Sequence, residues 1–368
     1  MSGTDTKNTA SIAENAALAK EKRGFPFKKV FFALLIVFII LSIFVLIVNI
    51  VINSYFSKVK VFDGVWEIDK EKAESMPIYQ DNYAYFAQSP EYHAAYDAAL
   101  LNHAQAMSDM RYDEGVYNYA LFGVDQFAGS DEDPATDIIM IVSVNEEKDH
   151  VTYLAFETRM LVYIPSVGVG PLNDAYVIGG PQLLANTLEE NYGIKLDGFV
   201  EINMTAFTEL IQVFGKIEIN GDAALVESIN NDILLFNEAK ELEGDKAVKP
   251  VKLENGKIYL EGEQTLAYLR NAGDGKAALA NEIMSQISTN IHGNGFGGVT
   301  TTLDIALEKM MVSMVRDDVG ALIMIGLSVF EKVESTPVGN MEGRDKIGFV
   351  GYTCDYAAER AAIVKALY

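Results

Sequence analysis

The 368-residue chain has few of the residues from which many catalytic and metal sites are built, with one cysteine and four histidines. A single cysteine cannot form a disulfide within the chain, and it excludes a zinc cluster made from several thiolates. No histidine stands beside a candidate nucleophile, and the HExxH, CxxC and P-loop patterns are all absent. The sequence therefore gives no support for a zinc protease, a thiol oxidoreductase or a P-loop nucleotide enzyme.

Basic residues are also scarce. The chain has 29 Lys and Arg against 52 Asp and Glu, which gives a net charge of -23. A nucleic-acid partner requires a basic surface that neutralises phosphates, so this balance argues against one. Hydrophobic residues make up 49% of the chain, which excludes general disorder. At this length we expect either one large domain with a substantial core or two smaller domains.

One long segment lacks charge altogether. Residues 30–52 (VFFALLIVFIILSIFVLIVNIVI) are 23 uncharged and mostly apolar residues. A helix of this length reaches roughly 35 Å at about 1.5 Å per residue, enough to cross the apolar core of a bilayer. The NSYFSK sequence that follows has no small-residue cleavage site, so we expect an uncleaved anchor. Five basic residues lie at positions 20–29 and only two follow closely, which predicts a cytoplasmic N-terminus and a domain outside the plasma membrane.

The patterns divide the chain into four parts: 1–29, a cytoplasmic tail; 30–52, the transmembrane helix; 53–115, an extracellular helical spacer rich in Tyr and Ala; and 116–368, a folded domain. In the last part, short β-rich runs (YALFGV, IIMIVSV, VTYLAF, FVEIN) alternate with helical stretches (PQLLANTLEENYG, MTAFTELIQVFG, GEQTLAYLR). Alternation of this kind predicts an α/β domain with a covered sheet.

Several local signals refine this organisation. The spacer segment PEYHAAYDAALLNHAQAMSDM begins with proline, as helices often do. Gly193 and Gly215 are placed to end two helices. A late strand is expected at KIGFVGY and a closing helix at DYAAERAAIVKALY. The segment GNGFGG (Gly293 to Gly298) fits a dinucleotide-loop spacing, but it follows a helical stretch and not a strand, so we expect a flexible connection between helices.

Two aspartates lie where neighbouring strands would meet. Asp125 closes the first β-rich run and Asp137 opens the second. Carboxylates at the ends of adjacent strands can hold one hard cation such as Mg²⁺. Each could instead simply cap a turn, and the spacing alone favours this second interpretation.

The stretches GVD…TDIIMIVSVN, VYIPSVG, LNDAYVIGGPQLL, GFVEINMTAFTELI and GEQTLAYLR occur in an order that resembles the LytR-CpsA-Psr family of Gram-positive cell envelopes. The likeness covers roughly residues 117–291. It implies a three-layer α/β/α domain with a central mixed sheet and an apolar lipid pocket, in which arginines surround a pyrophosphate and aspartates hold Mg²⁺. The implied activity is transfer of a glycopolymer from a polyprenyl-pyrophosphate carrier to peptidoglycan.

The resemblance also implies roles for particular residues. The metal-associated aspartates of the family fall on Asp125 and Asp137. The asparagine of its K-I-N-A-A-Y segment falls on Asn173, and the arginine that closes its A-Y-x-R segment falls on Arg270. The glutamine of its G-R-T-E-R-Q helix falls on Gln286, which together with Asn173 would contact the substrate.

Several arginines of the family are replaced in this chain. The R-D-T at the strand end becomes Thr158-Arg159-Met160, and other arginine positions become Phe127, Ala272, Glu282 and Ser285. A pyrophosphate brings several negative charges that guanidinium groups bind in a bidentate manner, which alanine, serine and threonine cannot do. Arg159 and Arg270 are therefore the candidate catalytic arginines, and Lys276 is the nearest basic residue that could compensate.

Three functions remain open from the sequence. The chain could be a degenerate family member that binds or scaffolds in the envelope, an active but divergent phosphotransferase, or a structural ectodomain. The direction of Arg159 bears on this choice. Because neighbouring residues on a strand point to opposite faces, the one-place shift predicts that Arg159 points away from the pocket unless the strand ends or bulges there.

Overall fold

The computed structural model describes residues 42, 46, 50, 53–54, 57, 60–62, 67–75, 89–125, 135–148, 150–243, 247–271, 276–293, 311–313, 333–334, 345–347 and 351–368. The chain forms two compact units, Met1–Ser54 and Tyr55–Tyr368. Most of the predicted anchor and all of the predicted cytoplasmic tail lie outside the described residues. Among the residues that are described, no helix has the length and apolar character needed to cross a membrane.

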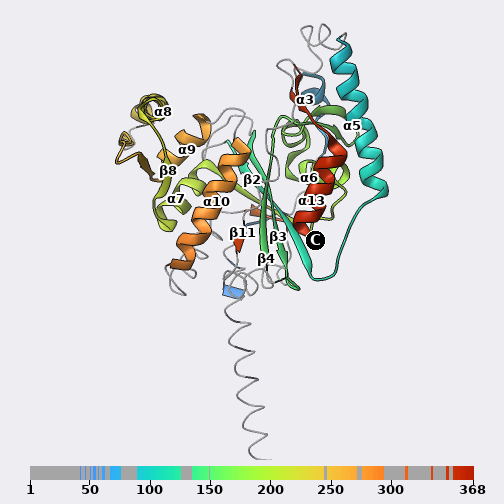
Figure 1. Ribbon diagram of the computed structural model, residues 1–368, viewed down its shortest axis with the longest axis horizontal. Coiled ribbons are helices and arrows are strands. Elements are labelled where there is room, and N and C mark those ends of the chain that lie inside the picture. The colour runs from blue at the N-terminus through green and yellow to red at the C-terminus, as the bar shows by residue number, and fades with distance from the viewer. Residues whose placement is uncertain are drawn as a thin grey trace, which may run out of the picture. The chain divides into compact units, whose positions relative to one another are not determined.

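A seven-stranded mixed sheet lies at the centre of the second unit (Figure 1). The order across the sheet is β1 (Lys60–Val61), β10 (Met311–Val312), β7 (Gly198–Asn203), β2 (Val116–Val124), β3 (Thr136–Asn145), β4 (His150–Phe156) and β11 (Val333–Glu334). Strands β2, β3 and β4 pair antiparallel, whereas β7 runs parallel to β2. The four β-rich runs predicted from the sequence are β2, β3, β4 and β7, so these predictions are confirmed.

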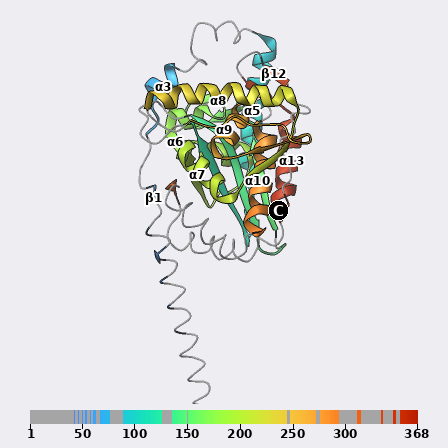
Figure 2. The same cartoon turned by 90° about the vertical axis from the view of Figure 1, so that its left-hand side faces the viewer.

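Helices cover both faces of the sheet (Figures 1 and 2). One side carries α3 (Lys70–Ser75), α5 (Pro90–Ser108), α6 (Asp174–Tyr192) and α13 (Tyr356–Leu367). The other side carries α7 (Met204–Phe214), α8 (Ala223–Glu243), α9 (Gly262–Asn271) and α10 (Lys276–Gly293). Helices α7 and α10 contact the sheet directly, and α8 packs on α9, in front of which it lies in Figure 2. The predicted α/β class is confirmed.

Separate hydrophobic cores form on the two sides of the sheet. Strand residues alternate between the faces, so Phe122 of β2 and Phe199 of β7 stack with their ring centroids 5.8 Å apart in the core beneath α6. The core among α7 to α10 also encloses a two-stranded sheet of β8 (Ile217–Asn220) and β9 (Lys257–Leu260). The two cores give the two sides of the sheet independent packing.

The helix boundaries follow the signals in the sequence. Gly193 ends α6 at φ 65°, and its N–H donates to the carbonyl of Glu189; Gly215 ends α7 at φ 100°. Helix α5 begins at Pro90, and its N-cap Ser89 accepts a hydrogen bond from the N–H of Tyr92. Tyr92 is also buried in the core beneath α6, so α5 is built into the domain, although it was predicted within the spacer.

The C-terminal segment differs in part from its prediction. KIGFVGY contributes to two short antiparallel strands, β12 (Asp345–Ile347) and β13 (Gly351–Thr353), and not to one strand. Because the two strands pair antiparallel, with Ile347 opposite Gly351, the chain reverses direction between them. The closing helix is α13, as predicted. A further hairpin is formed by β5 (Leu161–Ile164) and β6 (Gly168–Pro171). Of the GNGFGG segment, only Gly293 lies within the described residues.

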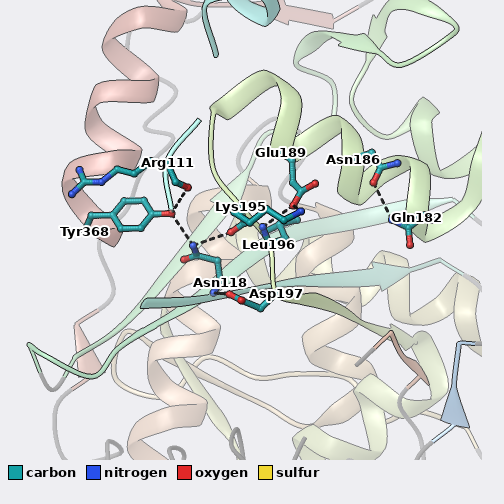
Figure 3. Close-up of polar contacts among 9 residues, drawn as sticks. All are labelled: Arg111, Asn118, Gln182, Asn186, Glu189, Lys195, Leu196, Asp197 and Tyr368. Atoms are coloured by element: carbon teal, nitrogen blue, oxygen red, sulfur yellow. Dashed lines mark hydrogen bonds and ion pairs between the residues drawn. The ribbon is translucent and has the colours of Figure 1, made fainter. Parts of the chain in front are cut away.

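Polar side chains tie together the end of the sheet where β2 begins (Figure 3). The amide nitrogen of Asn118 donates to the carbonyl of Lys195 at 3.1 Å and to the hydroxyl of Tyr368 at 3.0 Å. That hydroxyl donates in turn to the carbonyl of Arg111 at 3.2 Å, and the Arg111 guanidinium lies 4.4 Å from the Tyr368 ring centroid. The backbone N–H of Asn118 donates to Asp197 at 2.7 Å. These contacts join α13, β2 and the segment before β7.

Candidate functional site

The opposite end of the sheet gathers most of the predicted site residues. Val124 at the end of β2 pairs with Thr136 of β3 and with Asn203 of β7. Phe156 at the end of β4 pairs with Ile139 of β3. The ends of β2, β4 and β7 and the start of β3 therefore lie together, and the residues that follow or open these strands share one region.

The strand register brings the two predicted metal-associated aspartates to adjoining positions. Asp125 follows Val124, and its N–H donates to the carbonyl of Ala135 at 2.7 Å. In the pairing of β2 with β3, Val124 lies opposite Thr136 and Gly123 lies opposite Ile138. Asp137 is therefore the extra residue of a β-bulge. A bulge changes the direction of a side chain relative to a regular strand. The backbone of Asp125 just after β2 and that of Asp137 near the start of β3 therefore lie at the same end of the sheet.

Two carboxylates at adjoining positions suit the oxygen preference of Mg²⁺. A third candidate ligand is not found, since the described part of the chain contains no group of three or more His, Cys, Asp or Glu that could hold a metal ion. Binding of Mg²⁺ by Asp125 and Asp137 stays a prediction.

Arg159 lies in a turn and not on a strand. Strand β4 ends at Phe156, and the N–H of Met160 donates to the carbonyl of Glu157 at 3.1 Å, which closes a turn over residues 157–160. Because the strand has ended, alternation between faces no longer sets the direction of Arg159. Its side chain is exposed, and its positive charge acts on the carboxyl of Asp174 in α6. The turn therefore brings Arg159 toward the start of α6.

Asp174 is a site residue that the sequence reasoning missed. It is the first residue of α6, and burial raises the pKa of its carboxyl to about 7, although the nearby charge of Arg159 lowers it. Shifted carboxyl groups of this kind are enriched at functional sites. The available signal was an acidic residue inside the otherwise apolar stretch LNDAYVIGG, at a position where the resembled K-I-N-A-A-Y segment has alanine.

Asn173, a predicted substrate-binding residue, immediately precedes Asp174. Its N–H donates to the carbonyl of Thr158 at 2.8 Å, which connects α6 to the turn that carries Arg159. Its side-chain oxygen is buried and accepts no hydrogen bond from any residue that the structure describes. Buried polar atoms are nearly always paired, so an orphan oxygen beside Arg159 and Asp174 is suited to receive a donor from a ligand.

A polar pair of side chains lies two residues further along α6. The hydroxyl of Tyr176 donates to Oε2 of Glu201 on β7 at 2.7 Å. Burial raises the pKa of the Glu201 carboxyl and also that of the Tyr176 hydroxyl. Glu201 pairs in register with Phe122 at the centre of the sheet, so the pair extends the polar region from the strand ends into the core beneath α6.

The remaining predicted site residues lie on the other side of the sheet. Arg270 is in α9 and Lys276 opens α10, and their side chains lie outside what the structure describes. Gln286 of α10 has a structural contact: its amide nitrogen donates to the carbonyl of Glu218 in β8 at 2.6 Å, and its amide oxygen accepts from the N–H of the same residue at 2.8 Å. A substrate-binding role for Gln286 or Lys276 and a catalytic role for Arg270 remain predictions.

Comparison with known proteins connects this geometry to a family. The LytR_cpsA_psr family model matches residues 83–278, more than half of the chain. The polyisoprenyl-teichoic acid–peptidoglycan teichoic acid transferase TagU of Enterococcus faecalis is 25% identical over 229 residues, which cover 59% of this chain and 68% of that protein. The corresponding TagT of Bacillus subtilis is 30% identical over 157 residues, which cover 42% and 45% of the two chains.

Solved structures share the fold. A structure described as TagT bound to LIIa-WTA superposes with a TM-score of 0.51 at 21% identity, covering 70% of this chain and 92% of that one. A Streptococcus agalactiae protein superposes with a TM-score of 0.52 at 19% identity, covering 68% and 88%. At these identities the likeness shows the fold alone. The match of the family model over more than half of the sequence shows that this chain belongs to the LytR-CpsA-Psr family.

Proposed function

We propose that this chain binds a polyprenyl-linked glycopolymer at the strand-end site and acts chiefly by binding or scaffolding in the cell envelope, beside peptidoglycan. In this proposal residues 30–52 anchor it in the plasma membrane as a single span, with the N-terminus in the cytoplasm and the α/β domain outside. Family membership supports the ligand class, because relatives carry the names of polyisoprenyl-teichoic acid–peptidoglycan teichoic acid transferases.

The observation that carries the binding function is the hydrogen bond of 2.8 Å from the N–H of Asn173 to the carbonyl of Thr158, which holds the turn with Arg159 against the start of α6, where the charge of Arg159 acts on Asp174. In phosphoryl transfer the protein contributes mainly positioning and positive charge around the reacting phosphate. A carboxyl with a pKa of about 7 is roughly half ionised at neutral pH, and its charge offsets that of the neighbouring guanidinium. Such a site can still bind a phosphate group through Arg159, but it stabilises the charge of a transfer reaction less well than an arginine cluster does.

A second candidate is an active, divergent glycopolymer phosphotransferase. The adjoining positions of Asp125 and Asp137 favour it, because two carboxylates on one connection suit a divalent cation. When bound, Mg²⁺ would supply positive charge that neutralises a pyrophosphate. The two aspartates would hold it, and Arg159 would contact the phosphate from the turn after β4.

Binding and transfer can be separated in one preparation of the full chain in detergent. We expect the wild type to bind geranylgeranyl pyrophosphate, and Arg159→Ala to bind it about tenfold more weakly or worse, since charge-assisted hydrogen bonds are lost. With Mg²⁺, a lipid-linked teichoic acid and peptidoglycan, we expect no turnover. Turnover that Asp125→Asn abolishes would establish the transferase instead. No binding of either lipid by a folded chain would contradict both functions.

A further inference from the structure

The turn that carries Arg159 is held from several directions. Each backbone carbonyl from Glu157 to Leu161 accepts a hydrogen bond. In chain order the donors are Met160 N–H at 3.1 Å, Asn173 N–H at 2.8 Å, Tyr352 N–H at 2.9 Å, Leu172 N–H at 2.9 Å and the Tyr356 hydroxyl at 2.6 Å. Two of these donors come from the C-terminal segment, from β13 and from the first residue of α13.

Strand β13 approaches the turn more closely than a side chain would allow. A methyl group added at Gly351 would overlap the carbonyl oxygen of Arg159 and would lie 3.2 Å from the side chain of Leu161. Gly351 is not among the glycines with positive φ, so the close approach and not the backbone conformation requires glycine here. A backbone oxygen cannot rotate out of the way as the end of a long side chain can.

We infer that Gly351, through the contact of β13 with the 157–160 turn, is a positioning residue that sets where Arg159 presents its guanidinium at the strand-end site. This inference deepens the proposed function and rests on it for the ligand, though the positioning itself can be measured without one. Gly351 lies beyond residues 83–278, to which the family model matches. The positioning contact is thus supplied by a part of the chain outside the matched region.

Few contacts separate Gly351 from the guanidinium of Arg159. Next to Gly351, the N–H of Tyr352 holds the carbonyl of Arg159 at 2.9 Å. To accommodate a methyl group at Gly351, this carbonyl would have to move by about 1 Å to reach ordinary contact distance. Because this carbonyl belongs to Arg159 itself, its displacement also shifts the backbone from which the guanidinium extends. In catalytic sites a misplacement of about 1 Å can cost roughly a hundredfold in rate.

The pKa of Asp174 serves as a measure of the position of the Arg159 guanidinium. Arg159 is the charged group that acts on this carboxyl in the structure, and it lowers a pKa that burial raises. The other titratable groups at the first turn of α6 are Tyr176 in that turn and Glu201 on β7, which bond to each other. If Arg159 moves away from Asp174, the pKa of Asp174 must rise further. A substitution that only loosened the fold elsewhere would not produce this change.

The experiment compares four forms of the full chain in detergent: wild type, Arg159→Ala, Gly351→Ala and Gly221→Ala. The last is the matched control, because its methyl group would meet the end of the Ile258 side chain in the separate core among α7 to α10. The pKa of Asp174 is followed by NMR of ¹³C-labelled aspartate, with Asp174→Asn to assign the signal. Binding of geranylgeranyl pyrophosphate is measured on the same samples.

We expect Gly351→Ala to raise the pKa of Asp174 in the direction of Arg159→Ala and to weaken probe binding by about tenfold, while Gly221→Ala changes neither. The double variant Arg159→Ala/Gly351→Ala should bind the probe no worse than Arg159→Ala alone, because the two act through one group. Additive losses, or an unchanged pKa of Asp174 in folded Gly351→Ala, would overturn the inference.

If Gly351→Ala does not fold, Tyr356→Phe takes its place. This variant removes only the hydroxyl that donates to the carbonyl of Leu161. We expect a smaller rise in the pKa of Asp174, and no rise would contradict the inference. Failure of the wild type to bind the probe would reject the proposed function alone, since the pKa comparison decides the positioning of Arg159 without a ligand.

Discussion

The two ends of the central sheet use polar residues in opposite ways. Where β2 begins, Asn118 and Tyr368 form a hydrogen-bond network with the backbone of Lys195 and Arg111 (Figure 3). Where β2 ends, Arg159 is exposed beside a carboxyl that burial keeps largely protonated below neutral pH. The side-chain oxygens of Asn118 at the first end and of Asn173 at the second are both buried without a hydrogen bond from the described residues, so the two ends differ in their charged groups.

This difference implies that the β2 start contributes to stability and the β2 end to ligand binding. Paired polar groups stabilise a fold modestly, whereas a desolvated carboxyl costs free energy in the unliganded protein. Proteins retain unfavourably placed polar groups most often at functional sites, where a ligand can pair with them. Substitutions at the β2 start should therefore change stability alone, and substitutions at the β2 end should change ligand binding or pH dependence.

The largest effect on stability is expected from Asp174→Asn. The carboxyl has an ordinary pKa of 3.8 and a pKa of about 7 in the folded chain. Between these values the folded state holds a proton that the unfolded state has lost, so the free energy of unfolding falls as pH rises through the window. Asparagine does not titrate. The variant should therefore exceed the wild type by up to about 4 kcal/mol at pH 8 and by little at pH 4.

Urea unfolding at the two pH values measures this difference. Glu147→Gln provides the control, since Glu147 is an exposed acid in the turn between β3 and β4. Parallel stability curves for the wild type and Asp174→Asn would show that this carboxyl is not desolvated in the fold.

A smaller loss of stability is expected from Tyr368→Phe at the other end of the sheet. The change removes the hydroxyl shared by Asn118 and the carbonyl of Arg111, but it keeps the ring beneath the Arg111 guanidinium. We expect the free energy of unfolding to fall by about 1 kcal/mol and probe affinity to stay constant. Reduced affinity for geranylgeranyl pyrophosphate in a folded Tyr368→Phe protein would contradict the expectation that the β2 start affects stability alone.

The smallest expected effect concerns the two aspartates on the β2–β3 connection. If Asp125 and Asp137 hold Mg²⁺, adding Mg²⁺ should strengthen binding of geranylgeranyl pyrophosphate by less than about tenfold in the wild type. The variant Asp125→Asn/Asp137→Asn should bind with the same affinity with and without the metal. An equal response to Mg²⁺ in both proteins would place the cation elsewhere.

The sequence predicted the parts of the fold that depend on local pattern. Strands β2, β3, β4 and β7 follow from β-rich runs, and Gly193 and Gly215 end their helices as predicted. Asp125 follows the end of β2 and Asp137 lies near the start of β3, as the pattern indicated, while binding of one cation by both stays a prediction.

The rest depends on contacts that a linear pattern does not contain. Asp174 gains its altered pKa from burial and from a turn after β4, neither of which spacing specifies. Gly351 meets Arg159 through contact between segments far apart in the chain. The family resemblance predicts that Gln286 contacts the substrate, and in the structure its amide pairs with the backbone of Glu218. The resemblance did not indicate that partner.

The central claim is that Arg159 at the β2 end binds the ligand while the β2 start only stabilises the fold. Its most direct test is the affinity of the full chain in detergent for geranylgeranyl pyrophosphate, measured side by side for wild type, Arg159→Ala and Tyr368→Phe. We predict a loss of about tenfold or more for Arg159→Ala and none for Tyr368→Phe. Equal affinity in the wild type and a folded Arg159→Ala protein would contradict it.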